Sequence, residues 1–211
     1  MLKMLQEKGI NKPLFVSECG GNRAQTNERE QRIKALQFMR TCLIWLANGV
    51  SGIQQYEFMD YPHESLPSHF AMVRYAEHYR LPMFFAFREI IKSLTGAEPV
   101  LGAMKPTGTA MPSATVITLG DSLVRQTLFR RDEEMILAVW NCGEKTAELS
   151  LTLKAEHECS LEEKTFSLKG DVFVTAARTV LSPGILSRTL QGYQVRLLTV
   201  DRHALLACNL K

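Results

Sequence analysis

The feature that most restricts the fold is the segment from Leu14 to Gly21, a short apolar run that ends on a carboxylate and two glycines. A strand buried on both faces has such an uninterrupted apolar sequence, as in parallel sheets covered by helices. The carboxyl end of such a strand is where α/β sheets and barrels present chemistry, so Glu18 is the first functional candidate. The two glycines let the chain turn sharply at the rim of the sheet. An isolated Glu can also simply end a strand and face water.

The sequence after this strand predicts a helix and then a second parallel strand. Asn27 and Glu30 have the spacing of a capping box, which satisfies the first free N–H groups of a helix. Apolar residues then recur at three- and four-residue steps and predict one buried stripe that ends near Asn48: Ile33, Leu36, Met39, Leu43 and Leu46. The run from Gly52 to Phe58 is the next strand, and strand, helix, strand is the right-handed unit of a parallel sheet.

Two further helical segments complete the first part of the chain. A helical pattern runs from about Ser68 to Tyr79, and Pro82 is well placed as the first residue of a helix that reaches Leu94, with Gly96 as its cap. Residues 1–96 therefore read as two β/α units. The segment from Ala97 to Ala114 is rich in proline and turn residues and reads as a linker with room for one short strand.

From Thr115 onward the apolar residues follow a different period. Short β-prone runs are separated by turn residues, and the alternation in Glu148 to Leu153 is typical of a sheet with one wet face. The runs are Leu123 to Phe129, Met135 to Trp140, Ala147 to Leu153, Thr165 to Leu168, Val172 to Ala176, Thr179 to Leu181 and Tyr193 to Val200. Residues 97–211 are therefore predicted to form an antiparallel β-sandwich, so the fold class is α/β followed by all-β.

Composition excludes several classes of function. The 211 residues are 45% hydrophobic and carry a formal net charge of +3 without a basic cluster, so no nucleic-acid partner is expected. Apolar stretches such as Met135 to Trp140 are far shorter than the roughly 20 residues that cross a membrane, so no membrane partner is expected either. The five cysteines are widely spaced and predict free thiols, not disulfides or a zinc site. No nucleotide-binding or serine-hydrolase motif occurs, and no cofactor is expected.

Four segments, in this order, resemble the carboxyl-terminal third of a clan A glycoside hydrolase, a (β/α)8 barrel followed by a small β-sandwich. Lys12 to Gly20 is similar to the seventh barrel strand, which ends in a nucleophilic Glu, and Gly49 to Asp60 resembles the eighth strand and its loop. Arg80 to Arg88 looks like the start of the last barrel helix, and Ile136 to Asn141 resembles a core strand of the sandwich. The resemblance implies a partial TIM barrel, the last two β/α units, with an accessory β-sandwich.

The resemblance implies a carbohydrate substrate and a role for Glu18 as the nucleophile of a retaining glycosidase. In that mechanism two carboxyl groups about 5 to 5.5 Å apart divide nucleophilic attack and proton transfer. The family's eighth strand commonly ends in a Trp that forms a sugar platform, whereas Tyr56 and Phe58 are the aromatic residues present here. Asn22 and Asp60, in the loops that follow the two strands, are further candidates for binding sugar hydroxyls, although a loop residue without function is the simpler interpretation of each.

This chain departs from the family's pattern because it lacks the general acid. That acid ends the fourth barrel strand, far upstream of the nucleophile, and only seventeen residues precede Glu18 here. A whole barrel takes roughly 250 residues, so two β/α units cannot close one. We therefore expect a fragment: an amino-terminal region or a second chain supplies the rest of the barrel, or catalysis has been lost.

The residues leave some alternatives open. The chain could instead be a non-catalytic carbohydrate-binding or structural module; exposed aromatic residues on the sandwich would favour binding, and aromatic residues confined to its core would favour support. Strand alternation puts Glu57 with Ile53 and Gln55, opposite Gln54, Tyr56 and Phe58, without showing which set faces the barrel interior.

Other conspicuous side chains have simpler interpretations. His63, Glu64 and His69 could be drawn as a metal cluster, but their spacing fits no strong ligand motif, and no metal site is predicted. Trp45 and Trp140 lie in apolar runs and are assigned to helix packing and to the sandwich core.

Overall fold

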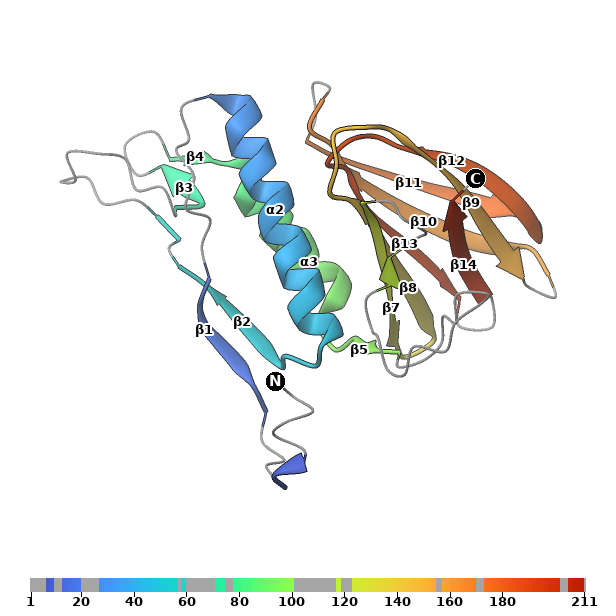
Figure 1. Ribbon diagram of the computed structural model, residues 1–211, viewed down its shortest axis with the longest axis horizontal. Coiled ribbons are helices and arrows are strands. Elements are labelled where there is room, and N and C mark those ends of the chain that lie inside the picture. Colours follow the sequence, from blue (N-terminus) through green and yellow to red (C-terminus); the bar gives the residue numbers. More distant parts are fainter. Residues whose placement is uncertain are drawn as a thin grey trace.

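The described part of the chain contains a two-stranded parallel sheet, two helices, a short antiparallel pair of strands and two larger antiparallel sheets (Figure 1). The computed structural model describes residues 7–9, 13–19, 27–56, 58–59, 71–74, 78–100, 117–118, 123–154, 157–169, 173–201 and 205–210. The helices lie between the parallel pair of strands and the antiparallel sheets in Figure 1. Among the described strands, no sheet closes on itself.

The first β/α unit forms as the sequence predicts. Strand β1 (Phe15–Cys19) pairs in parallel with β2 (Gly52–Gln55), and helix α2 (Glu28–Ala47) connects them. The side chain of Asn27 accepts a hydrogen bond from the Glu30 backbone N–H at 3.0 Å, which is the predicted helix cap. Strand β2 is shorter than predicted and ends at Gln55, where the Tyr56 N–H still donates to the Cys19 carbonyl at 2.9 Å.

The segment before the second helix differs from the prediction. Where a helix was expected from Ser68 to Tyr79, the described residues form a short antiparallel pair, β3 (Val73–Arg74) and β4 (Tyr79–Arg80). Directly beside this pair, the Leu81 N–H donates to the Met72 carbonyl at 2.9 Å. Helix α3 (Pro82–Leu94) then begins at the predicted proline and is followed by Gly96 at φ +77°, a conformation that favours glycine.

The remaining strands form two antiparallel sheets. A seven-stranded sheet has the order β11-β10-β13-β8-β7-β5, with β6 also paired to β7, and a three-stranded sheet has the order β12-β9-β14. The strands of the first sheet are β5 (Glu98–Pro99), β6 (Ile117–Thr118), β7 (Val124–Arg131), β8 (Glu134–Asn141), β10 (Cys159–Phe166), β11 (Val174–Leu181) and β13 (Val195–Asp201). Those of the second are β9 (Ala147–Lys154), β12 (Gly184–Leu190) and β14 (Leu205–Leu210).

The seven-stranded sheet is the middle layer of the molecule, because its two faces belong to two separate cores. On β8, Ile136 and Trp140 pack in the core that contains the helices, whereas Leu137 and Val139 pack in the core shared with the three-stranded sheet. Trp140 is fully buried, as predicted, but it packs against the helices and not between the two sheets. Alternate side chains of β8 therefore pack against the helices on one side and against the three-stranded sheet on the other.

Two buried polar contacts join the helices to the middle sheet. Arg40 of α2 donates to the Asn141 carbonyl at 3.2 Å. Lys164 of β10 reaches two side chains of α3, with its Nζ 3.2 Å from Glu89 Oε2 and 3.1 Å from Ser93 Oγ. Burial alone raises the pKa of Glu89, but hydrogen bonds and charges from Lys164 and Arg88 outweigh it and hold this pKa below the ordinary value of 4.5.

We expect Lys164→Met to lower the free energy of unfolding by about 2 kcal/mol at pH 7, because it leaves the Glu89 carboxylate buried with less compensation. The double variant with Glu89→Gln should lose less than this single variant. Since the folded pKa of Glu89 is lowered, its contribution is complete above pH 4.5 and is lost as the pH falls through the lowered value.

Urea unfolding at pH 7 and below pH 4.5 measures both effects. Arg130→Gln is the matched control. The Arg130 and Glu98 side chains form an ion pair but are 60% and 76% exposed, so loss of this pair should change the free energy of unfolding very little. Equal losses in Lys164→Met and Arg130→Gln would contradict the proposed role of the buried contact.

Candidate active site

An irregularity in β1 places the carboxylate of Glu18. Val16 is paired with Ile53, and Cys19 is paired with Gln55, so β1 advances three residues where β2 advances two. The extra residue is a β-bulge that includes Ser17 and Glu18. Bulges occur next to active sites because they redirect side chains at the end of a strand.

The bulge divides β1 between two environments. Val16 and Cys19 both pack into the core formed with the helices, although strict alternation would put them on opposite faces. Phe15, Ser17 and Glu18 are exposed. We call the surface of the parallel pair that faces away from the helices the open face.

The open face also includes residues of β2. Ile53 packs against the core of the helices, so Gln54 and Tyr56, which are exposed, lie on the other side. Of the two sets of residues that strand alternation distinguishes, the set with Gln54 and Tyr56 therefore lies away from the helices. The Phe15 ring covers Gly52 on this sheet: a Cβ added at Gly52 would lie 2.6 Å from Phe15 Cδ1.

Behind Glu18, the next residue anchors the strand to helix α2. The Cys19 side chain is buried against Cys42, whose side chain is fully buried. A hydrogen bond with Cys42 lowers the pKa of the Cys19 thiol, and the same contact together with burial raises the pKa of Cys42 well above its usual value. The thiol pair therefore fixes the helix side of the strand end, and Glu18 is left on the other side.

The other predicted site residues have different surroundings. Tyr56 is 45% exposed and follows β2 directly, with its N–H bonded to the strand end that carries Glu18. Phe58 is 54% exposed, and its ring packs edge-to-face on Phe84 of α3 with 6.3 Å between ring centres. Asn22 and Asp60, and also Glu57, His63, Glu64 and His69, lie outside the described residues.

Ser17 and Gln54, which are exposed on the same two strands, are not predicted as site residues from the sequence. Regular period-two alternation would put Ser17 and Glu18 on opposite faces, whereas both are exposed at the irregularity in β1. No cluster of three or more metal-ligating side chains occurs in the described part of the chain. No helix among those residues is long and apolar enough to cross a membrane.

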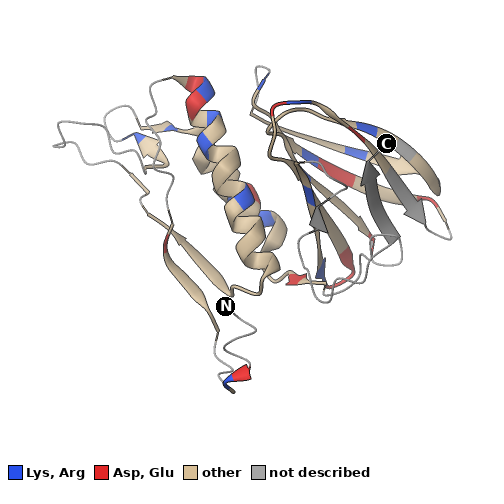
Figure 2. Ribbon diagram, in the orientation of Figure 1, with Lys and Arg blue, Asp and Glu red and all other residues tan. Residues whose placement is uncertain are grey.

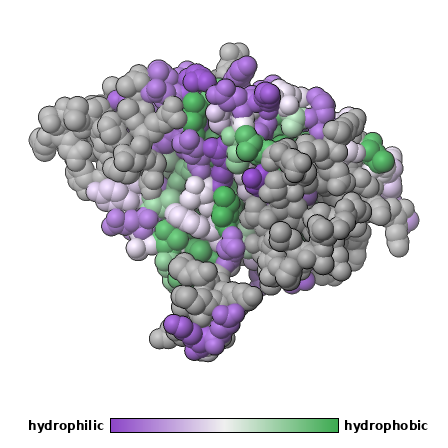
Figure 3. Space-filling view, viewed as in Figure 1, coloured by the Kyte–Doolittle hydropathy of each residue, from purple (hydrophilic) through white to green (hydrophobic). Residues whose placement is uncertain are grey.

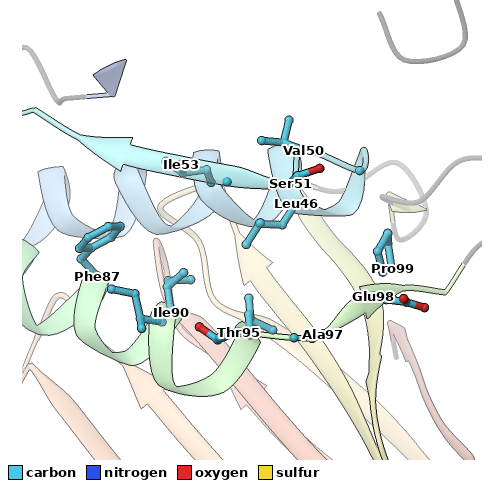
Figure 4. A pocket seen from close by; sticks show the side chains of 15 residues that line it. Leu46, Val50, Ser51, Ile53, Phe87, Ile90, Thr95, Ala97, Glu98 and Pro99 are labelled. Atoms are coloured by element: carbon cyan, nitrogen blue, oxygen red, sulfur yellow. The ribbon is translucent and has the colours of Figure 1, made fainter. Parts of the chain in front are cut away.

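A groove of about 540 Å³ beside the parallel pair runs between the start of β2 and the carboxyl-terminal half of α3 (Figure 4). Its walls are mainly apolar, with Leu46, Val50 and Ile53 on one side and Phe87 and Ile90 on the other. It lies at the amino end of β2, whereas Glu18 is at the carboxyl end of β1, the end at which α/β barrels present chemistry.

The structure is similar to solved glycoside hydrolases. A family 30 endoxylanase from Clostridium papyrosolvens matches with a TM-score of 0.61 and 11% identity, over 94% of this chain and 44% of that chain. A family 30 subfamily 8 xylanase from Clostridium acetobutylicum matches with a TM-score of 0.64 and 10% identity, over the same shares. A family 86 β-porphyranase from Bacteroides plebeius matches with a TM-score of 0.52 and 11% identity, over 94% and 36%.

These similarities concern the fold. The chain spans less than half the length of the solved proteins it matches. No protein-family model matches the sequence, and no curated protein matches it. The protein therefore has a glycoside-hydrolase-like fold over nearly all of its own length.

The bulge makes a prediction about chemical accessibility at neighbouring positions. In a Glu18→Cys variant, we expect the new thiol to react with iodoacetamide much faster than Cys19, because position 18 is exposed and Cys19 is 7% exposed. Both cysteines lie in one peptide, so mass spectrometry of that peptide compares them under identical conditions. Faster alkylation of Cys19 than of position 18 would show that the strand end is turned the other way.

Proposed function

We propose that the chain is the carboxyl-terminal part of a retaining glycoside hydrolase, with Glu18 as its nucleophile. In this proposal, residues 1–96 are the last two β/α units of a (β/α)8 barrel, and residues 97–211 are an accessory β-sandwich. The observation that supports the proposal is the irregular carboxyl end of β1, where Glu18 is exposed while Cys19 is buried against the helices.

The open face exposes apolar side chains, as expected for part of a barrel wall whose neighbouring strands are missing. Phe15, near the amino end of β1, is 65% exposed, although aromatic side chains at strand positions are normally buried. In a closed barrel this side chain would enter a packed layer, and Glu18 would stand above it at the rim. Figure 3 shows other hydrophobic side chains at the surface around the helices and the parallel pair. The apolar groove beside β2 fits the same interpretation, because further strands and helices would fill it.

The chemistry assigned to Glu18 is nucleophilic attack on the anomeric carbon of a sugar. A bond forms between a carboxylate oxygen and that carbon, the glycosidic bond breaks, and an acid donates a proton to the departing oxygen. Water then hydrolyses the glycosyl ester with the help of the same acid, now acting as a base. The anomeric configuration is retained because each of the two steps inverts it.

The general acid is assigned to polypeptide outside these 211 residues. An additional amino-terminal region or a second chain would complete the barrel and bring the acid opposite Glu18. The solved glycoside hydrolases support this, because more than half of each of their chains has no counterpart here. Retaining geometry would then require about 5 to 5.5 Å between the two carboxyl groups.

Sugar binding is assigned to Tyr56, Phe58, Asn22 and Asp60. Tyr56 has the strongest support, because its exposed ring lies beside the strand end on the open face, where it can stack on a sugar. Phe58 is half exposed, but one edge is already engaged by Phe84.

The alternative of a carbohydrate-binding sandwich receives no support from the aromatic residues. After residue 100 the chain has five of them, and all five are buried or partly buried: Phe129, Trp140, Phe166, Phe173 and Tyr193. Sugar platforms need exposed rings. The antiparallel sheets are therefore assigned a supporting role behind the helices.

An activated glycosyl donor separates the two carboxyl roles, because dinitrophenolate leaves without protonation and so does not need the missing acid. We expect dinitrophenyl 2-deoxy-2-fluoroglycosides to add one glycosyl group to Glu18, read by intact and peptide mass spectrometry. Glu18→Gln should abolish the addition, and Glu98→Gln, the same change at a 76% exposed carboxylate elsewhere, should leave it unchanged.

Two results would contradict the proposal in different ways. Glycosylation of another carboxylate, or of none across pentose and hexose donors, would remove the nucleophile assignment. Glu18-dependent hydrolysis of unactivated alkyl glycosides by the 211-residue chain would show that its own residues already supply the general acid.

A further inference from the structure

A second hollow, of about 370 Å³, lies between the two helices and the middle sheet. It is formed by the first turns of α2 and α3, strand β4 and the beginning of β11. We call it the arginine cleft, after three of its lining residues: Arg32, Arg80 and Arg88. It shares no lining residue with the open face that holds Glu18.

The arginine cleft has an excess of positive charge. Glu28 is its only acidic lining residue among those described, and it pairs with Arg32 at 2.5 Å. Arg88 pairs with Glu89 at 3.0 Å. Arg80 is exposed and lies over the Phe84 ring at 5.0 Å, and no carboxylate of the described residues pairs with it. Basic residues, blue in Figure 2, occur on both helices and on the sheet that faces them.

Aromatic side chains provide flat apolar surfaces in the same cleft. Tyr79 is 53% exposed at its edge, and Phe85 and Phe173 lie deeper. The Arg88 Cζ atom lies over the Phe85 ring, 5.2 Å from its centre, in a cation–π contact. Guanidinium groups bind carboxylate and phosphate through paired hydrogen bonds, and aromatic faces bind rings, so both elements of a ligand site are present.

The two helices add to the positive electrostatic potential of the arginine cleft. Both begin at the arginine cleft, and the positive ends of their dipoles lie there. At the start of α3 no side chain caps the helix, since Leu81 occupies the cap position. The volume of the cleft is near the lower limit of pockets that bind small organic molecules, about 300 Å³, and fits a single ring with its substituents.

We infer that the arginine cleft binds a small cyclic molecule that carries an oxyanion, either a carboxylate or a phosphate. The oxyanion pairs with Arg80 and Arg88, and the ring lies among Tyr79, Phe85 and Phe173. This binding is separate from the glycosidase proposal, because Glu18 takes no part in it.

Isothermal titration with three matched probes tests the inference: phenyl phosphate, benzoate and the neutral amide benzamide. We expect saturable one-to-one binding of phenyl phosphate, benzoate or both, and none of benzamide at the same concentration. Whichever anion binds more tightly identifies the oxyanion. Arg80→Gln should weaken binding roughly tenfold, as for the loss of one charge-assisted pair. Because Arg80 is exposed, this variant should keep the wild-type thermal unfolding temperature.

Two controls make the result specific. Arg130→Gln removes the same charge at an exposed position outside the cleft and should leave the affinity unchanged, and so should Glu18→Gln. The inference is overturned if neither anion binds, if benzamide binds as tightly as the anions, or if Arg130→Gln weakens binding as much as Arg80→Gln. None of these outcomes depends on whether the chain hydrolyses glycosides.

Discussion

The extra residue in β1 is the constraint on which the candidate active site depends. Because β1 advances three residues between Val16 and Cys19 while β2 advances two, both of these side chains pack on the helices. The bulge costs one position of regular pairing but keeps the strand anchored at both sides of Glu18. A regular strand would anchor only one of these two side chains and could not hold the carboxylate on the open face in this way.

The layers behind the parallel pair explain how two strands are held in place. Alternate residues of β8 fill one core with the helices and another with the three-stranded sheet, so the middle sheet supports α2 and α3 over a wide apolar contact. The contacts of Arg40 and Lys164 fix the helices laterally on that sheet. The helices in turn hold Val16, Cys19 and Ile53, and a two-stranded sheet that would be marginal alone gains its stability from them.

Sequence patterns predicted those parts of the fold that depend on local chemistry. The Asn27 cap, the proline start of α3 and the parallel strand-helix-strand unit follow from capping, backbone geometry and periodicity. The strands that the sequence predicts only in part, or not at all, depend on distant partners. Strand β10 begins six residues before the predicted run from Thr165 to Leu168, and in its charged part Glu163 pairs with Arg196 of β13 and Arg188 of β12. In β11, an exposed edge strand, nothing requires the apolar alternation that marks a half-buried strand, so the sequence predicts two short runs where the structure has one continuous strand.

The candidate active site also combines features that depend on local sequence with features that depend on distant partners. Glu18 can be proposed from the sequence because it ends an apolar run, whereas the register shift beside it depends on pairing with β2. A crystal structure of the polypeptide isolated from its native source, together with any chain that stays bound to it, would test the orientation of the Glu18 carboxylate directly. We expect a second carboxyl group about 5 to 5.5 Å from Glu18 across the open face. A structure in which the open face is covered by polypeptide that brings no carboxyl group near Glu18, or in which Glu18 faces bulk solvent outside a closed barrel, would contradict this expectation.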